Sequence, residues 1–278
     1  MTDILEWSGP VGDIWAQEWQ RTDRSFGELT AQLVPAMIDA APESGNAIDI
    51  GCGAGETAIG IAATRHDLNV TGIDISEGLL EIARNRAKGL HNISFEHGDA
   101  AQQVAGHAPV DLYISRHGVM FFDDPVAAFS RFHTAASADA SLIFSCFRDW
   151  TLNGFASEIM ALTNGEAPGE EPGPFAFASK DRVAAILAQS GWRNAEAVPI
   201  DFHYVAGQGD DPVADAMSFM MRIGPAARAI RMAPDSERGA LVEGLRQICE
   251  AHRDHDTVIF PAAAWIWTAR ARKGEAHA

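Results

Sequence analysis

Cysteine is scarce in this chain of 278 residues, which carries only three, Cys52, Cys146 and Cys249. Thiols spread so widely do not form the framework of disulfides that stabilises small secreted domains. Long apolar runs are also missing. The one near the carboxyl end, 258–267, contains Pro261 and is shorter than the roughly 20 residues that cross a bilayer. The first residues lack the positive and apolar segments of a signal peptide. These absences predict a cytoplasmic protein that does not contact a membrane.

Positive charge is the second shortage. Lysine and arginine together number 21 against 38 aspartates and glutamates, which gives a formal net charge of −17. Such a field repels phosphate backbones and anionic membranes, so the sequence argues against nucleic acid and membrane partners and favours a small-molecule partner. The oligomeric state stays open, with a homodimer among the alternatives. Hydrophobic residues, at 47%, are frequent enough for a folded core.

Short apolar strands alternate with helical segments over the first half of the chain. The strands are expected at 46–50, 69–73, 93–96, 110–115 and 141–147. Ser76, and Asp124 with Pro125 after it, are residue types that begin helices. This alternation predicts a parallel sheet whose ligands bind beyond the carboxyl ends of its strands.

The alternation breaks after residue 147, where we expect insertions. A helix that begins after Ser179 and strands at 195–201 and 264–270 continue the core. We therefore predict a three-layer α/β sandwich with a mostly parallel seven-stranded sheet, one antiparallel strand and a mainly helical cap. The predicted core comprises 41–147, 179–202 and 257–278. The predicted cap comprises a helical segment at 1–40 and the insertions 148–178 and 203–256.

The most informative motif is a glycine loop between the first strand and the helix that follows it. It reads Asp49-Ile50-Gly51-Cys52-Gly53-Ala54-Gly55-Glu56-Thr57. Glycines there let the backbone approach a ligand closely, and the amides at the start of the helix suit an anionic group. The loop also fits the dinucleotide pattern, and Asp74 lies where a ribose-binding acid is expected in either case. An NAD-dependent oxidoreductase is therefore one alternative.

Two acids favour S-adenosylmethionine (SAM) over NAD. Asp49 suits a ligand that carries an ammonium and a sulfonium, and it would oppose a pyrophosphate. Asp99, within Gly98-Asp99-Ala100 after the third strand, offers a carboxylate to an adenine amino group. SAM is therefore the predicted cofactor.

Four segments resemble, in order and spacing, the motif regions of class I SAM-dependent methyltransferases. They are 49–57, 72–76, 98–100 and 115–122. The chain is most similar to the UbiE-like, type 11 bacterial group of that family, and the resemblance extends over most of its length. It implies a Rossmann-like fold and methyl transfer from SAM to oxygen, nitrogen or carbon of a small molecule, with S-adenosylhomocysteine as the product.

The same resemblance implies a set of donor-site residues. They are Asp49, Gly51, Cys52, Gly53, Gly55, Asp74, Ile75, Gly98, Asp99, Ala100, Ser115 and Arg116. In this assignment the glycine backbone passes under the methionine part of the donor, close to Asp49. Asp74 accepts hydrogen bonds from the ribose hydroxyls, and Ile75 packs on the adenine, whose edge faces Asp99. Ser115 and Arg116 close the site near the methionine part.

His117 follows the fourth strand, at a position where the related proteins often have an aromatic residue, frequently Phe. It is a candidate general base with an ordinary pKa of about 6.5. The alternative is a ring that packs as an aromatic and hydrogen-bonds a neighbour. Further candidates for binding an apolar or aromatic acceptor are Trp15, Phe177, Met221 and Arg222. The alternative for the apolar ones is the cap's own core.

Cys249, His252 and His255 have a spacing faintly like that of metal ligands, but no further cluster accompanies them, and we predict no metal. A fold by itself does not establish chemistry. A SAM-binding sensor or partner protein without catalytic activity is therefore the other alternative to a methyltransferase.

Overall fold

The computed structural model describes residues 9–163, 165 and 167–272. Residues 1–8 and 273–278, the outer ends of the segments predicted at 1–40 and 257–278, lie outside the described residues. Among the described residues, no helix has the length and hydropathy needed to cross a bilayer.

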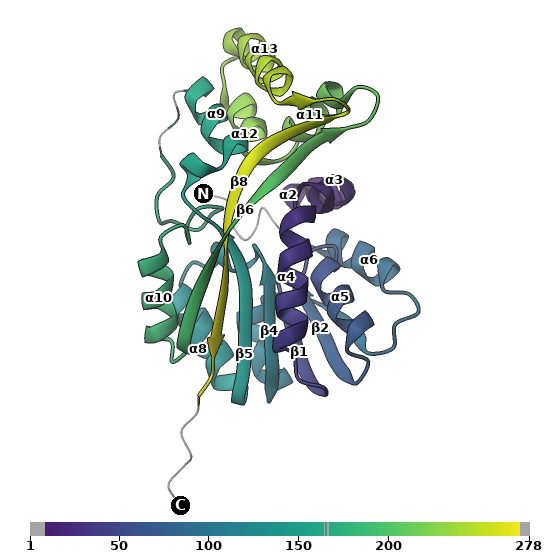
Figure 1. Ribbon diagram of the computed structural model, residues 1–278, viewed down its shortest axis with the longest axis vertical. Helices are drawn as coiled ribbons and strands as arrows, with labels where there is room; N and C mark the ends of the chain where they lie inside the picture. Colours follow the sequence, from purple (N-terminus) through teal and green to yellow (C-terminus); the bar gives the residue numbers. More distant parts are fainter. Residues whose placement is uncertain (1–8, 164, 166, 273–278) are drawn as a thin grey trace, which may run out of the picture.

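A single twisted sheet forms the centre of the molecule (Figure 1). Its strands lie in the order β3-β2-β1-β4-β5-β8-β6. Their bounds are β1 (Gly45–Ile50), β2 (Leu68–Asp74), β3 (Ile93–His97), β4 (Val110–Arg116), β5 (Ala136–Phe147), β6 (Arg193–Gln208) and β8 (Thr257–Arg270). The first five strands pair in parallel, and β8 runs antiparallel to both β5 and β6. This confirms the predicted sheet with one antiparallel strand.

One strand was not predicted. The two-residue strand β7 (Arg253–Asp254) pairs with β8 and brings the sheet to eight strands. Two residues carry no periodic pattern of apolar side chains, so the sequence gives no signal for such a strand.

Helices cover both faces of the sheet. One layer holds α4 (Gly27–Ala40), α5 (Glu56–Thr64) and α6 (Glu77–Arg86), and the other holds α7 (Ala100–Gln103), α8 (Pro125–Ala135) and α10 (Lys180–Gln189). The middle strands are apolar throughout because both faces are covered, and the last four residues of β1 are all buried. The predicted helix starts are confirmed. Ser76, Asp124 and Ser179 each accept a hydrogen bond from a backbone amide in the first helical turn.

Strands β6 and β8 continue beyond the core sheet and carry the cap (Figure 1). The cap helices are α9 (Gly154–Thr163), α11 (Pro212–Met220), α12 (Gly224–Met232) and α13 (Asp235–Ala251). Both strands are longer than predicted, and the boundary expected between 202 and 203 falls inside β6. The reason lies in the burial of alternate residues on both sides of that boundary, Phe202, Tyr204 and Ala206, which carries the ladder with β8 past it, with a bulge between Val205 and Gly207.

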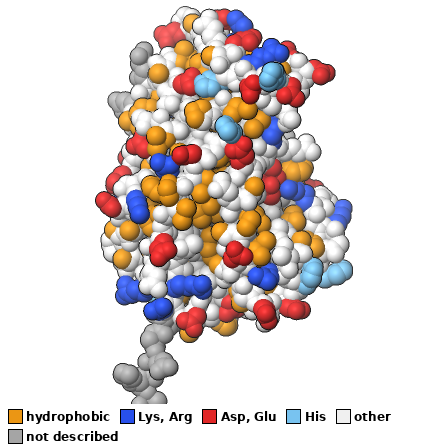
Figure 2. Space-filling model, in the orientation of Figure 1, with side chains coloured by type: hydrophobic (Ala, Val, Ile, Leu, Met, Phe, Trp, Pro, Cys, Tyr) orange, Lys and Arg blue, Asp and Glu red, His pale blue; other side chains and the backbone are white. Residues whose placement is uncertain are grey.

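Two short helices lie between the cap and the carboxyl edge of the sheet, α2 (Pro10–Gln17) and α3 (Trp19–Ser25) (Figure 1). Helix α2 packs on α6, and α3 packs on β6. On the face shown in Figure 2, a band of hydrophobic side chains runs down the middle, over the region of α4, β5 and β8. Charged side chains of both signs surround this band.

Candidate active site

The glycine loop connects β1 to α5 in a tight turn. Gly51, Gly53 and Gly55 have φ angles of 64°, 53° and 82°, in the left-handed region that favours glycine. The amides of Gly51 and Cys52 both donate to the carbonyl of Ile73, at 2.9 and 3.2 Å, which ties the loop to the end of β2. Cys52 is buried behind the loop, and burial raises the pKa of its thiol. The loop is therefore a rigid cradle of backbone.

Asp49 is the buried acid beneath this cradle. Its side chain is fully buried, and one carboxylate oxygen accepts a hydrogen bond of 2.6 Å from the Thr57 hydroxyl. The other oxygen, Oδ1, has no hydrogen-bond partner among the described residues. Burial raises the pKa of Asp49 to about 7, although Thr57 and the Arg116 charge oppose the rise. A buried carboxylate with a free oxygen fits a cationic ligand group at this loop.

Asp74 holds the loop from the neighbouring strand. It accepts hydrogen bonds of 2.8 Å from the Gly53 amide and 2.8 Å from the Ser76 amide. Burial raises the pKa of Asp74, while these amides oppose the rise. The carboxylate therefore sits at the carboxyl end of β2 with both oxygens fixed in direction. Ile75, which follows it, is half-buried.

Asp99 follows β3, the strand next to β2 in the sheet. It caps α7 by accepting a hydrogen bond of 2.8 Å from the Ala101 amide, and the Gln102 side chain donates to its second oxygen at 3.0 Å. The Gly98 amide donates to the carbonyl of Asp74 at 2.9 Å, which holds the ends of β3 and β2 together. Ala100, in the first turn of α7, is buried.

The strand order places these acids side by side. Since β3, β2 and β1 are neighbours and parallel, Asp99, Asp74 and Asp49 line one edge of the sheet. The order of the acids along this edge matches the order of the parts of SAM, because an adenine, a ribose and a charged methionine follow one another in that molecule. The residues present therefore suit SAM as the cofactor.

Ser115 and Arg116, at the end of β4, are both engaged with the protein itself. The Ser115 hydroxyl donates to the Ile50 carbonyl at 2.7 Å and accepts from the Gly118 amide at 3.1 Å. The Arg116 guanidinium pairs with Asp23 of α3 at 2.8 Å and with Glu56 of α5. Arg116 thus connects the glycine loop to the N-terminal helices.

Asp23 of α3 forms a second ion pair, which the sequence did not predict. Its other carboxylate oxygen lies 2.8 Å from Arg86 of α6. Arg86 also donates to the Ala54 carbonyl of the glycine loop at 2.9 Å, and its guanidinium lies 4.3 Å from the centre of the Trp19 ring. These residues are far apart in the chain, and no local pattern predicts that they meet. Helix α3 is fastened over the donor site by them.

His117 lies within a cluster of aromatic rings on the cap side of the glycine loop. Its ring centre is 5.0 Å from Phe26 and 4.2 Å from Phe147. Tyr204 stacks on Phe155 at 4.4 Å, and both reach this cluster through Phe26 and Phe147. We call these residues, with Phe175, the aromatic cluster. It draws on α3–α4, β4, β5, α9 and β6, and it adjoins the loop because Gly118 packs on Gly51.

The structure corrects one prediction about His117. Burial, with a smaller contribution from the Arg116 charge, lowers the pKa of this imidazole to about 3, so the expected value of about 6.5 is wrong. The Nδ1 atom lies 2.8 Å from the Ser145 hydroxyl. In this structure the ring packs among aromatic side chains, and its one hydrogen-bonding neighbour among the described residues is Ser145.

The other acceptor candidates do not lie together around one site. Phe177 packs in the core against Phe129 and Phe144, at ring distances of 6.2 and 6.4 Å. Phe175, two residues earlier, is the one that joins the aromatic cluster, 5.4 Å from Phe147. The sequence could not separate them, because the loop that carries both has no regular period.

Three candidates lie near the N-terminal helices or the surface. Trp15 is half-buried on α2, and Met221 is 41% exposed after α11. Arg222 forms an ion pair of 2.8 Å with Glu18. It therefore serves as a link between the cap and the N-terminal helices in this structure.

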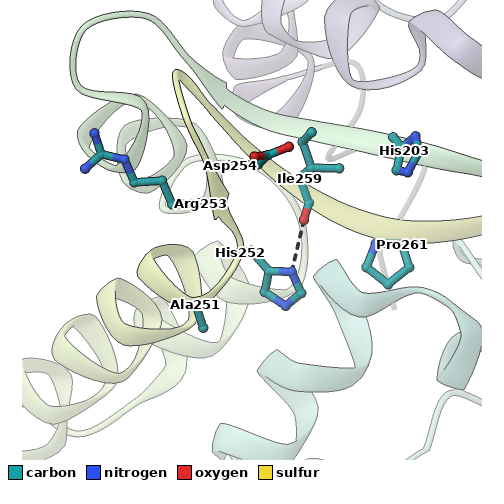
Figure 3. A pocket seen from close by; sticks show the side chains of 7 residues that line it. All are labelled: His203, Ala251, His252, Arg253, Asp254, Ile259 and Pro261. Carbon is teal, nitrogen blue, oxygen red and sulfur yellow. Dashed lines mark hydrogen bonds between the residues drawn. The ribbon is translucent and has the colours of Figure 1, made fainter.

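A shallow hollow of about 390 Å³ lies on the outside of the cap (Figure 3). Its lining includes His203, His252 and Asp254 and shares no residue with the glycine loop or the aromatic cluster. His252 bonds through Nδ1 to the Ile259 carbonyl at 3.0 Å and through Nε2 to Glu158 at 2.6 Å. Both of its nitrogens are engaged, so it is not free to bind a metal.

The chain matches known methyltransferases. The model of the methyltransferase domain family matches residues 47–138. An O-methyltransferase of Pyrenophora dematioidea is 30% identical over 73% of this chain and 74% of its own length. A demethylmenaquinone methyltransferase of Staphylococcus saprophyticus is 22% identical over 54% of this chain and 71% of its own length.

The fold is similar to that of solved structures, among them a methyltransferase. The YcgJ protein of Bacillus subtilis superposes with a TM-score of 0.57 at 17% identity, over 88% of this chain and all of that one. A phosphoethanolamine N-methyltransferase of Haemonchus contortus, bound to S-adenosylhomocysteine, superposes with a TM-score of 0.52 at 16% identity, over 92% of this chain and 56% of that one. With the cradle of glycines and the row of three acids, these matches decide against the NAD-dependent alternative. The chain belongs to the class I SAM-dependent methyltransferases and is an enzyme that uses SAM as its cofactor.

Proposed function

We propose that this enzyme methylates an oxygen of an apolar, aromatic small molecule that binds among the residues of the aromatic cluster. One observation carries the proposal. The cluster of aromatic rings around His117 adjoins the glycine loop directly, because a Cβ added to Gly51 would lie 3.1 Å from the Gly118 backbone. Aromatic walls favour aromatic ligands through area burial and ring packing.

The choice of oxygen is supported by one relative. The O-methyltransferase of Pyrenophora dematioidea is 30% identical over most of both chains. The Staphylococcus relative, named for demethylmenaquinone, also points to a ring-shaped and apolar acceptor. The cytoplasmic location stays a prediction from the scarce cysteines and the missing signal peptide and membrane span, and the lack of nucleic acid and membrane partners stays a prediction from the net charge of −17.

The donor site follows from the three acids. We propose that Asp49 binds the cationic end of the methionine part, that Asp74 accepts from the ribose hydroxyls, and that Asp99 faces the adenine edge. Bound SAM supplies the methyl group: its carbon–sulfur bond breaks with the electron pair left on sulfur, a carbon–oxygen bond forms, and the hydroxyl proton passes to water. The protein contributes mainly by holding the two reactants in line.

The cap is proposed to select the acceptor. The N-terminal helices and the two insertions predicted at 1–40, 148–178 and 203–256 supply Phe26, Phe155 and Tyr204 to the aromatic cluster. The core supplies only His117 and Phe147, at the ends of β4 and β5. Most of the acceptor's apolar surface would therefore contact the cap.

The experiment is a screen of acceptors with SAM labelled in its methyl group. The panel pairs phenols and naphthols with aliphatic alcohols and aromatic amines of similar size. We expect label on the phenolic oxygen of at least one aromatic member, with unlabelled S-adenosylhomocysteine formed in equal amount. Label only on aliphatic or nitrogen acceptors would contradict the proposal. A Phe147→Ala variant, which keeps the donor site, should lose turnover with the aromatic acceptor.

A further inference from the structure

His117 has a backbone conformation that costs energy. Its φ angle is 62°, in the left-handed region that non-glycine residues seldom adopt. Its amide donates to the carbonyl of Ser145 at 3.2 Å, and Gly118 after it packs on Ile50 and Gly51 so closely that a side chain there would clash. Such strain persists where the surroundings fix it, and it is concentrated at functional sites. The strain here aims the imidazole away from β4 and into the aromatic cluster.

The imidazole has one nitrogen engaged and one without a partner. Nδ1 lies 2.8 Å from the hydroxyl of Ser145, which is fully buried. Nε2 has no hydrogen-bond partner among the described residues, although His117 is only 9% exposed. A buried polar atom without a partner destabilises the folded protein, so the unpartnered nitrogen calls for an explanation.

The Ser145 hydroxyl decides which nitrogen carries the proton. If the hydroxyl donates to Nδ1, its hydrogen is used and only the Nε2–H remains unpaired. If Nδ1–H donates instead, both the hydroxyl hydrogen and the Nε2 lone pair remain unpaired. The first arrangement leaves fewer buried groups unpaired and is the one we adopt. Nε2 is then a hydrogen-bond donor.

In the described part of the chain, no acceptor lies within hydrogen-bond reach of Nε2. The neighbouring rings of the His117 imidazole are Phe26 and Phe147. The adjacent charged residue, Arg116, is a donor and is bound to carboxylates. A ligand that enters between these rings and carries an oxygen lone pair would satisfy the unpaired N–H.

We propose that His117 is the polar anchor of the acceptor site, where its Nε2–H donates a hydrogen bond to an oxygen on an aromatic acceptor. Ser145 is the positioning residue that fixes this tautomer. The inference rests on the proposed function and deepens it, because it adds a requirement for an oxygen lone pair to the requirement for an aromatic ring. The anchor discriminates between acceptors of the same shape that differ in this one atom.

The test compares 2-naphthol with 2-methylnaphthalene, two probes of nearly equal shape. Equilibrium dialysis against the full chain saturated with S-adenosylhomocysteine measures the binding of each. We expect about tenfold tighter binding of 2-naphthol, the amount that one buried hydrogen bond supplies. His117→Phe should abolish the preference and still bind S-adenosylhomocysteine. The matched variant His203→Phe, at an outer histidine paired with Glu28, should keep it.

A second readout reports the tautomer directly. In protein labelled with ¹⁵N-histidine, the His117 Nε2 should appear protonated and its resonance should move with 2-naphthol but not with 2-methylnaphthalene. Ser145→Ala should shift the resonances toward a mixture of tautomers. An unprotonated Nε2, or equal affinities for the two probes, would overturn the anchor alone. Failure of both probes to bind would contradict the aromatic acceptor site, and the anchor with it.

Discussion

Asp49 shows how one buried atom defines a binding site. The Thr57 hydroxyl satisfies one of its oxygens at 2.6 Å, and Oδ1 has no hydrogen-bond partner among the described residues. A carboxylate that is fully buried is unfavourable unless it is paired, and burial raises its pKa to about 7 for that reason. A cationic ligand would supply the missing partner.

The first prediction concerns Asp49→Asn. This change keeps the shape of the side chain and removes the charge, so SAM should bind roughly 10- to 100-fold more weakly, equivalent to about 1.5–3 kcal/mol for a charged hydrogen bond. Calorimetric titration measures the change. Asp111→Asn is the matched control, since Asp111 accepts from the Asn46 amide at the start of β1 instead of its end. Equal SAM affinities in the wild type and Asp49→Asn would refute the role of Asp49.

The pH dependence of turnover should not report His117. Its pKa is lowered to about 3, mainly by burial, so the ring is neutral from about pH 5 to 8. The ratio of kcat/KM between the wild type and His117→Phe should therefore stay constant over that range, because groups that titrate near 7 affect both proteins alike. Rate measurements with one aromatic acceptor at several pH values give this ratio. A ratio that changes through about 6.5 would restore the general base.

Helix α3 connects the donor site to the cap, and ion pairs make the connection on both sides. Asp23 pairs with Arg86 and Arg116, each at 2.8 Å. On the cap side, Arg24 lies 2.7 Å from Asp215 of α11. Partly buried pairs of this kind tolerate the loss of one partner poorly, because the remaining charge is left without compensation. Helix α3 therefore links the residues around the glycine loop to the cap through a few ion pairs.

The third prediction concerns Asp23→Asn. Two arginines then lose their shared carboxylate, so α2 and α3 should open more often and SAM should dissociate about tenfold faster. Hydrogen exchange of the amides in α2 and α3 and stopped-flow displacement of SAM measure the two effects. Asp235→Asn removes the carboxylate of an exposed pair with Arg238 and should change neither. Unchanged exchange in Asp23→Asn would show that other contacts hold the helices.

At the scale of elements, sequence patterns predict what local chemistry determines. The strands of the first half, the glycine loop and the caps at Ser76 and Asp124 depend on neighbours in the chain, and the structure confirms them. The outer halves of β6 and β8 depend on each other, across a ladder from Phe202–Ala262 to Gln208–Thr257. A strand that is stabilised by a distant partner gives a weaker signal in its own sequence.

The residues of the site likewise fall into those that the sequence predicts and those that only the fold reveals. The three acids could be named from the sequence because each lies near the carboxyl end of an expected strand: Asp49 within β1, Asp74 as the last residue of β2, and Asp99 two residues after β3. The engagement of Arg116 with Asp23 and the depressed pKa of His117 arise from burial beneath segments far away in the chain. The sequence shows which residues are charged, and the fold decides which of them lose contact with water.

At the scale of the molecule, core and cap share the ladder between β6 and β8, which has a bulge between Val205 and Gly207. Strands β6 and β8 run from the core sheet into the cap, so neither part can lose its strands without disturbing the other. Helix α11 packs on this ladder at Gly207, where an added Cβ would lie 2.0 Å from the Pro212 carbonyl oxygen. We therefore expect core and cap to unfold together, in one cooperative transition.

Gly207→Ala tests this coupling. The added methyl group has no space against the backbone of α11, so the whole protein should lose about 1–3 kcal/mol of unfolding free energy while retaining a single transition. Scanning calorimetry and denaturant titration, followed by both fluorescence and circular dichroism, measure the two quantities. Gly239→Ala is the control, since it lies in α13 with open space around it and should stabilise the protein by about 0.5–1 kcal/mol. Two separate transitions in Gly207→Ala would mean that the cap unfolds on its own, and the shared ladder would then not couple it to the core.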